Sequence, residues 1–291
     1  MTRAVDIQAR LAGMSELGEI VGAMRSVAVM RMQQAQRSLA AVRLYAGSIA
    51  DALRMALPLL PLWGAAAPAP GSARLLILCM AEHGFVGGFN ERLLDAVAAR
   101  RQAHEPLFVV GSRGVTLAME RGWQLAWTRT MATRMEGIGA VVQALTDELF
   151  RRLAGGGVGE AVVLFARCER GGQEALVSRR LFPLDCAGLA PAANDLAPLH
   201  NLPPDELLEA LTMQYVLAQL TEAATESLAS ENAARFQAME AAHDNVAHKL
   251  ERLQQQARVA RQEEITTELM DLVTGAAAIE AVPRRAVIRG P

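Results

Sequence analysis

The stretch that decides the fold covers residues 204–275 and reads PDELLEALTMQYVLAQLTEAATESLASENAARFQAMEAAHDNVAHKLERLQQQARVARQEEITTELMDLVTG. From Asp205 to Thr274 it contains no glycine and no proline, and it is rich in residues with high helix propensity. The proline pair at 203–204 suits the start of a helix, and Gly275 suits its end. A helix of about 70 residues is roughly 105 Å long, too long for an ordinary globular domain to enclose. The length predicts a coiled coil, a membrane span or a strut.

A second long helix is predicted over residues 2–57, where apolar or small residues recur in steps of four and three. This period of 3.5 predicts a left-handed supercoil. The same register places Arg25 in the stripe, beside Met24, where the charge either extends outward to solvent or marks a site that faces a partner. The members of the stripe are Ile7, Leu11, Met14, Gly18, Val21, Ala28, Met32, Ala35, Leu39, Val42, Ala46, Ile49, Leu53 and Ala56.

The C-terminal helix carries a matching stripe of small and apolar residues. Two long helices at opposite ends of a chain most simply pair antiparallel, and the longer C-terminal helix is then expected to overhang by tens of ångströms. The stripe comprises Ala229, Ala233, Phe236, Met239, Val246, Leu250, Leu253, Ala257 and Ala260, and it resumes at Ile265, Leu269 and Leu272.

The middle of the chain, residues 72–185, changes character. A buried strand is predicted at 74–80, further strands at 107–111, 123–128, 161–166 and 175–182, and helices at 90–103, 112–121 and 137–153. This alternation predicts a mostly parallel sheet covered by helices. The predicted fold class is therefore α/β: a Rossmann-like domain inserted into a long antiparallel two-helix coiled coil. The expected boundaries are 1–57 and 204–279 for the coiled coil, 72–185 for the inserted domain, 58–71 and 186–203 for linkers, and 280–291 for a C-terminal extension, either disordered or projecting.

The composition of the chain disfavours several classes of partner and of site. The net charge of −2 and the pI near 6.2 give no reason to expect nucleic acid or an anionic membrane surface as a partner. The three cysteines have no CxxC spacing, which indicates a reducing compartment and disfavours a disulfide framework or a zinc site. No signal peptide is recognisable at the N-terminus. The uncharged run 55–73 contains four prolines, so it is expected to be a linker and not a membrane span.

No stretch predicts an active site. The segment GFVGGFN (84–90) follows a strand and precedes a helix, but it matches neither the Walker nor the GxGxxG pattern. A structural turn with Asn90 near the helix cap is favoured over a phosphate-binding loop, and the same holds for GSRG (111–114). The histidines show no metal-ligand spacing, so no catalytic, metal or cofactor-binding residue is assigned. A rod and a compact body without catalytic groups suggest a mechanical or tethering role.

Two polar clusters on the C-terminal helix remain. Glu231 and Arg235 are spaced i,i+4 and would form a helix-stabilising pair. For this pair, and for Arg258, Arg261, Gln262 and Thr266, the residues alone favour a solvated helix face.

Several stretches together resemble the gamma subunit of F-type ATP synthases, of the bacterial type. They are SENAARFQAMEAAHDN (230–245), ARQEEITTELMDLVTGAAA (260–278), AMRSVAVMRMQQAQ (23–36) and GFVGGFN. The resemblance extends over essentially the whole chain. In that family the glycine-rich segment is structural and binds no nucleotide.

The resemblance implies a non-catalytic subunit that acts as the central-stalk rotor of the enzyme. The coiled coil would turn inside a hexamer of alpha and beta subunits, while the α/β domain, together with the epsilon subunit, would rest on the membrane c-ring. Ion flow would turn the rod and drive the beta subunits through their binding states. The expected location is the cytoplasmic face of the bacterial inner membrane, reached only through the complex.

The resemblance also implies a role for six positions. By match to the family motifs, Met24, Glu231, Arg235, Arg261, Gln262 and Thr266 are expected to contact loops of the beta subunits, and replacing Arg235 or Gln262 with alanine is expected to weaken coupling. The chain departs from the family pattern after Met24, where the family's basic patch is usually lysine-rich. Here it has Arg25 and Arg31, with glutamines at 33–34 where basic residues are common. An alternative function is a Rossmann-like nucleotide-binding enzyme with a coiled-coil arm, and another is a homo-oligomeric tether.

Overall fold

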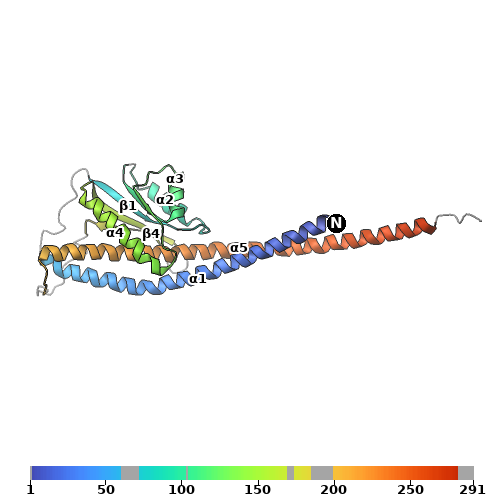
Figure 1. The fold of residues 1–291 in the computed structure, drawn as a ribbon, viewed down its shortest axis with the longest axis horizontal. Coiled ribbons are helices and arrows are strands. Elements are labelled where there is room, and N and C mark those ends of the chain that lie inside the picture. Colours follow the sequence, from blue (N-terminus) through green and yellow to red (C-terminus); the bar gives the residue numbers. More distant parts are fainter. Residues whose placement is uncertain (1, 60–71, 103, 169–173, 185–198, 281–291) are drawn as a thin grey trace, which may run out of the picture. The chain divides into compact units, whose positions relative to one another are not determined.

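The computed structural model describes residues 2–59, 72–102, 104–168, 174–184 and 199–280. Two long helices, α1 (Thr2–Ala56) and α5 (Pro204–Glu280), precede and follow an α/β insertion along the chain (Figure 1), which confirms the predicted fold class. The predicted linkers and C-terminal extension lie largely outside the described residues. The chain divides into two compact units, Met24–Met239 and Met1–Ala23 with Glu240–Pro291.

The stripe predicted on α1 is the face that the helix buries. Every member from Ile7 to Ala56 is buried or half-buried, and Ala28, Ala35 and Leu53 are fully buried. Arg25 is half-buried in the same register. The 3.5-residue period therefore predicts the packed face of α1 along its whole length.

Within the unit 24–239, the two helices run antiparallel. Ala35 and Leu39 of α1 pack in one cluster with Ala229 of α5, and Leu53 packs with Leu208. As the residue number rises along α1, the partner number on α5 falls, which is the signature of antiparallel pairing.

The unit 1–23 with 240–291 shows the same antiparallel pairing. Gly18 of α1 approaches Val246 of α5 so closely that a Cβ at residue 18 would lie 3.3 Å from Cγ1 of Val246. Further along, Met14 and Leu253 line one groove between the helices. Small residues at such positions let two helix backbones approach each other.

The apolar residues near the C-terminal end of α5 are exposed. Ile265, Leu269 and Leu272 are between 49% and 69% exposed, in agreement with the expected overhang. The predicted helix stop at Gly275 is wrong, because α5 continues to Glu280. Glycine inside a helix costs only about 1 kcal/mol relative to alanine, so it need not end one.

A five-stranded sheet forms the centre of the insertion. The strands are β1 (Ala73–Cys79), β2 (Leu107–Val110), β3 (Trp127–Arg129), β4 (Val158–Cys168) and β5 (Glu174–Phe182), in the order β3-β2-β1-β4-β5. β1, β2, β3 and β4 are parallel, and β5 is antiparallel to β4. In the centre, Leu76 of β1 is in register with Leu107 of β2 and with Val162 of β4. β1 is buried on both faces from Leu75 onward, as expected for a covered parallel sheet.

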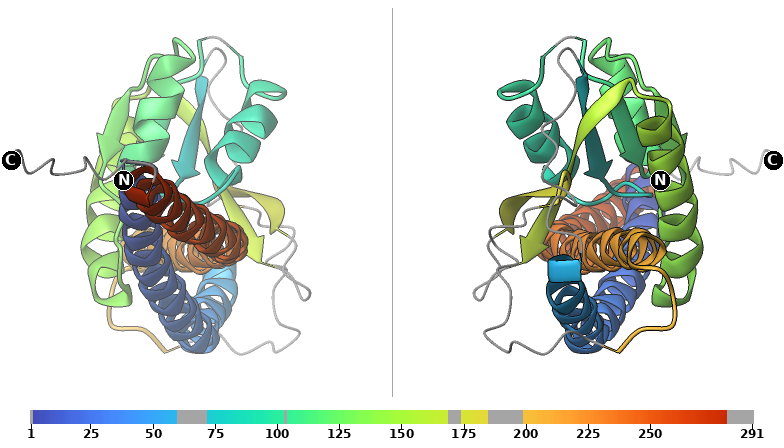
Figure 2. Two further views of the ribbon diagram at one scale, coloured as in Figure 1. Left: turned by 90° about the vertical axis from the view of Figure 1, so that its right-hand side faces the viewer. Right: turned by 90° about the vertical axis from the view of Figure 1, so that its left-hand side faces the viewer.

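Helices cover both faces of the sheet (Figure 2). α4 (Ile138–Ala154) and α5 pack on the face of β1 that carries Leu75 and Ile77. α2 (Phe89–Ala98) and α3 (Ser112–Glu120) pack on the face that carries Leu76 and Leu78. Short 3-10 turns complete the described elements at Leu57–Leu59 and Met135–Gly137.

The strand predicted at 123–128 begins further along the chain and is shorter, since β3 covers only Trp127–Arg129. Gly122, at φ 73°, turns the chain after α3, and the backbone N–H of Trp123 still donates to the carbonyl of Ala118 at 3.1 Å. The Trp123 ring lies 5.2 Å from the guanidinium of Arg101. Residues pair in register with β2 from Trp127 onward, whereas Trp123 is held by these contacts with α3 and with Arg101.

Candidate functional site

One segment of α5, residues 222–235, is buried at every position. A helix on a protein surface normally buries one stripe, whereas this segment is enclosed by α1 and the insertion. Buried polar groups need hydrogen-bond partners, so these residues show how the insertion is attached. We call it the buried polar segment, after its members Glu222, Thr225, Glu226, Ser227, Ser230, Glu231, Asn232 and Arg235.

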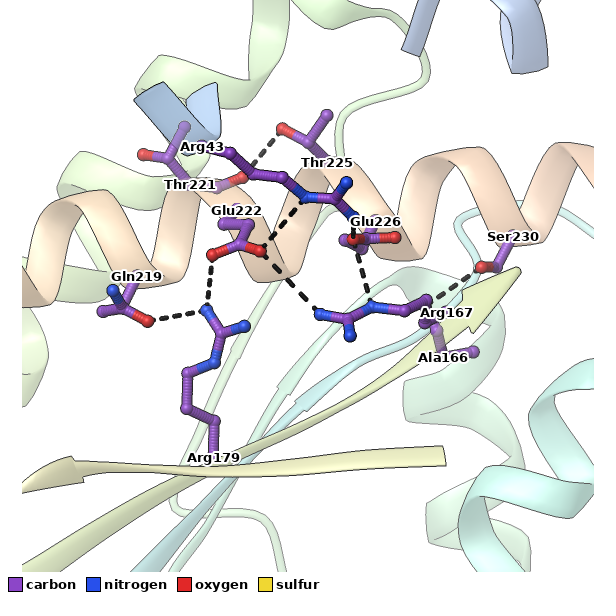
Figure 3. A network of polar contacts seen from close by, with 10 residues as sticks. All are labelled: Arg43, Ala166, Arg167, Arg179, Gln219, Thr221, Glu222, Thr225, Glu226 and Ser230. Atoms are coloured by element: carbon purple, nitrogen blue, oxygen red, sulfur yellow. Dashed lines mark hydrogen bonds and ion pairs between the residues drawn. The ribbon is translucent and has the colours of Figure 1, made fainter. Parts of the chain in front are cut away.

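Two carboxylates at the start of this segment meet three guanidinium groups (Figure 3). Arg179 of β5 donates from Nη1 to Oε2 of Glu222 at 2.7 Å, and Arg167 of β4 donates from Nε to Oε1 of Glu226 at 3.1 Å. Arg43 of α1 pairs with Glu226 and lies 3.5 Å from Oε1 of Glu222. We call these five residues the Arg–Glu joint, since they connect α1, the sheet and α5.

The electrostatics of the joint favour the ionised form of Glu222. Burial alone would raise the pKa of Glu222, but the hydrogen bond from Arg179 and the charges of Arg179, Arg43 and Arg167 lower it below its ordinary value. Two carboxylates one helical turn apart repel each other, and three arginines more than offset their charge. The guanidinium groups of Arg167 and Arg179 lie 5.9 and 5.5 Å from the ring centre of Phe165, which adds a cation–π contribution.

Two serines at the middle of the segment bind the ends of neighbouring strands. The hydroxyl of Ser227 donates to the carbonyl of Cys79 at the end of β1 at 2.8 Å, and that of Ser230 donates to the carbonyl of Ala166 near the end of β4 at 3.0 Å. The strand order reverses between β1 and β4, and doubly wound sheets bind their ligands at the carboxyl ends of such a pair. Here α5 occupies that position.

This packing predicts that Cys79 is chemically inert in the native chain. Cys79 is buried, and burial raises the pKa of its thiol to about 12, so almost no reactive thiolate exists at neutral pH. We expect iodoacetamide to leave Cys79 unmodified in the native protein and to modify it in urea, as read by mass spectrometry. Cys168, which is half-buried, is the internal control. Equal native labelling of the two thiols would contradict the packing of α5 over β1.

The end of the segment holds the glycine-rich loop. Arg235 donates from Nη2 to Oε1 of Glu231 at 2.7 Å, and the same nitrogen lies 3.4 and 3.3 Å from the carbonyl oxygens of His83 and Gly84. Nη1 of Arg235 donates to Oδ1 of Asn232 at 3.3 Å. Burial raises the pKa of Glu231, and the charge of Arg235 only partly opposes this. The ion pair thus joins α5 to residues 83–84.

The loop itself is built as a structural turn. Asn90 is buried in the first turn of α2, and its Oδ1 accepts a hydrogen bond from the backbone N–H of Ala81 at 3.0 Å. It lies near the helix cap as expected, two residues after the N-cap residue Gly88. Phe85, at φ 61°, is 68% exposed at the tip of the loop. The side chains that hold the loop therefore serve the fold, as the sequence favoured.

A carboxylate stabilises the neighbouring GSRG segment. Glu82 accepts hydrogen bonds from the backbone N–H of Ser112 at 2.9 Å, the hydroxyl of Ser112 at 2.6 Å and the backbone N–H of Met131 at 2.7 Å. Burial would raise the pKa of Glu82, but these hydrogen bonds lower it. The N-terminus of α3 is thus occupied by a side chain of the protein itself.

The structure brings some of the predicted contact residues together. Glu231 pairs with Arg235, and the hydroxyl of Thr266 donates to the carbonyl of Gln262 at 2.8 Å. The interpretation of Glu231 and Arg235 as a solvated face is wrong, because they are only 3% and 7% exposed beneath the loop. Arg261, Gln262 and Thr266 are exposed on α5, and Met24 is half-buried on α1. Contact with another subunit stays a prediction for all six residues.

Sequence reasoning missed the Arg–Glu joint. Its partners come from α1, β4, β5 and α5, and nothing in their spacing along the chain links them. One signal in the sequence was available. Arg167 follows Val163 and Phe165 at every second residue of β4, so it shares the buried face of that strand. A charge in a buried register requires a partner charge.

Neither a metal cluster nor a membrane span is found in the part of the chain that the structure describes. There, no group of three or more His, Cys, Asp or Glu side chains is placed to hold a metal ion. No described helix is both long enough and apolar enough to cross a bilayer.

Comparison with known proteins identifies the family. The sequence model of the ATP synthase family matches residues 3–279. The ATP synthase gamma chain of Streptomyces avermitilis is 29% identical, over 93% of this chain and 94% of its own. That of Streptomyces coelicolor is 28% identical over the same shares.

Solved structures show the same fold. A chain in the rotor of the Euglena gracilis mitochondrial ATP synthase has a TM-score of 0.63 at 12% identity, over 91% of this chain and 99% of its own. One in the central stalk and c-ring assembly of Tetrahymena thermophila has a TM-score of 0.56 at 18% identity, over 77% and 99%. With the helix pair, the insertion and the family match in agreement, the chain belongs to the ATP synthase gamma-chain family.

Proposed function

We propose that this chain is the central-stalk rotor of a membrane F-type ATP synthase. In this role it couples ion-driven rotation of a c-ring to ATP synthesis or hydrolysis in the beta subunits, without catalytic groups of its own. Its partners would be the alpha and beta subunits, the epsilon subunit and the c-ring. It would lie at the cytoplasmic face of a bacterial inner membrane, attached through the complex.

The observation that carries the proposal is the family match over residues 3–279, together with the antiparallel helix pair that it covers. The exposed apolar residues Ile265, Leu269 and Leu272 on α5 supply a surface suited to turning inside a protein sleeve. Affinity at each catalytic site would change only as far as the rotor interacts differently with the states of the beta subunits.

The test is reconstitution of the complex with and without this chain. Complexes that contain alpha, beta, epsilon and c subunits are expected to show ATP-driven ion uptake into vesicles only when this chain is present. A probe on the chain should rotate during ATP hydrolysis when the hexamer is immobilised. Ion uptake without the chain, or hydrolysis without rotation of the probe, would contradict the proposal.

A single exposed side chain tests the proposed beta-subunit contact. We expect Gln262→Ala to lower the number of ions pumped per ATP hydrolysed several-fold, because one hydrogen bond is worth about 1 kcal/mol. The control is Gln254→Ala on an exposed face of the same helix. Unchanged coupling in the Gln262 variant, with assembly intact, would remove Gln262 from the contact.

The nucleotide-binding alternative gains no support from the site. α5 occupies the strand ends where such a fold binds its ligand, through Ser227 and Ser230. Calorimetric titration of the chain with ATP and with NAD is expected to show no saturable binding.

A further inference from the structure

The Arg–Glu joint is the charged part of the contact between α5 and the sheet, beside the two serine hydrogen bonds to strand ends. Most of that contact is apolar and includes small side chains, such as Ala223 and Ala224. Apolar contact is non-directional, so it resists separation more than sliding. Hydrogen-bonded ion pairs are directional, and they resist sliding as well.

Each carboxylate of the joint is shared between α1 and the sheet. Glu226 pairs with Arg43 of α1 and with Arg167 of β4. Glu222 lies within 3.8 Å of Arg167, 3.5 Å of Arg43 and 2.7 Å of Arg179. A rotation of the insertion about α5 would therefore move the guanidinium groups of the sheet away from the carboxylates with which they pair.

The two sides of the joint are unequally exposed. The side chains of Glu222 and Glu226 are 10% and 3% exposed, so they cannot exchange their partners for water without cost. The arginines reach in from the surface, and the side chain of Arg43 is 52% exposed. Phe165 lies beside Arg167 and Arg179, and its ring adds a cation–π attraction to both guanidinium groups.

We propose that the Arg–Glu joint locks the α/β insertion to the helix pair against rotation about α5, so that torque applied to the insertion reaches the helices. The proposal rests on the rotor function proposed above. Its five members act as positioning residues, since none touches a substrate. Figure 3 shows the carboxylates on α5 between arginines that arrive from opposite sides.

The variants to compare are Arg167→Gln and Arg43→Gln, because both residues are partly exposed and their loss leaves the apolar core intact. Arg37→Gln, at an exposed position of the same helix as Arg43, is the matched control. Arg167→Lys keeps a positive charge beside both carboxylates and should stay closer to wild type than Arg167→Gln.

The measurement uses the reconstituted complex with its hexamer immobilised and a bead on Glu120→Cys, an exposed position of the insertion. At a stalled catalytic state, we expect Arg167→Gln to widen the mean-square angular fluctuation of the bead at least two-fold. Ions pumped per ATP should fall several-fold, while ATP hydrolysis per assembled complex stays within two-fold of wild type. The control should match wild type in all three readouts.

Two results would overturn the proposal. The first is unchanged angular fluctuation and pumping ratio in the variants of the joint. The second is a lower yield of complex with an unchanged ratio per complex, which would show a role in stability alone. Either differs from failure of the rotor function itself, in which the wild-type bead would not rotate during hydrolysis.

Discussion

Replacing Arg235 with leucine is expected to lower the free energy of unfolding of the chain by about 3 to 5 kcal/mol at neutral pH. The change leaves Glu231, only 3% exposed, as a buried carboxylate without its partner. It also removes the donor that lies near the carbonyl oxygens of His83 and Gly84. The loss can be measured by urea unfolding of the full chain, followed by tryptophan fluorescence, because Trp123 and Trp127 lie in the insertion.

This loss should shrink as the pH falls. Burial raises the folded-state pKa of Glu231 above its unfolded value. A carboxyl group shifted in this direction stabilises the fold fully below its unfolded pKa, and the contribution is lost as the pH rises through the folded pKa. Without Arg235 the folded pKa rises further, so proton uptake by Glu231 relieves more of the defect in mild acid than at neutral pH. Variant and wild type are compared at the same pH. The pKa values of Glu82 and Glu222 are lowered in the folded state, so the stability that these two groups contribute falls in acid in both proteins.

A second substitution separates charge from packing. The double variant Glu231→Gln with Arg235→Leu removes both charges and is expected to be more stable at neutral pH than Arg235→Leu alone. Equal losses in the single and double variants, or a loss independent of pH, would show that the uncompensated carboxylate is not the cause.

Sequence periodicity predicts the packed face of α1 because the repeat of apolar residues along one helix is a local pattern. On α1, the seven-residue repeat alone selects Ala28, Ala35 and Leu53, all of which are fully buried. On α5, the same reasoning predicts a narrow stripe, but residues 222–235 are buried on every side. A repeat along one helix reports its main partner helix and contains no information about a sheet that packs on the opposite side.

The attachment of the insertion could not be read from spacing. Glu226 finds Arg43 and Arg167, which lie 183 and 59 residues away along the chain. The pair Glu231 and Arg235 has correct helical spacing, yet spacing does not tell a solvated pair from a buried one. This pair is buried because the loop at residues 83–84 covers it, and the position of that loop follows from the sheet topology.

Replacing Gly111 with alanine is expected to cost at least about 3 kcal/mol of stability, through backbone strain and steric overlap together. Gly111 has φ 114°, where a side chain is rarely accommodated, and a Cβ there would lie 2.4 Å from the carbonyl oxygen of Met80. Its backbone N–H also donates to the carbonyl of Arg129 at 2.8 Å, which ties the turn to the end of β3. Neither partner is the flexible end of a side chain, so the overlap can be relieved only by moving the sheet. The loss can be measured by the same urea unfolding.

Two other glycines separate these causes. Gly122 has φ 73°, but a Cβ added there would meet no atom within 4 Å, so Gly122→Ala should cost only about 1 kcal/mol, from strain alone. Gly139 lies in α4 with the same free space and no unusual φ, so Gly139→Ala should stabilise the chain by about 0.5 kcal/mol. The loss in free energy of unfolding should therefore decrease in the order Gly111, Gly122, Gly139. This order requires that the end of β1 and the turn after β2 lie as close together as described. A Gly111 variant no worse than the Gly122 variant would mean that this contact yields, and the glycine at 111 would then need an explanation other than close packing.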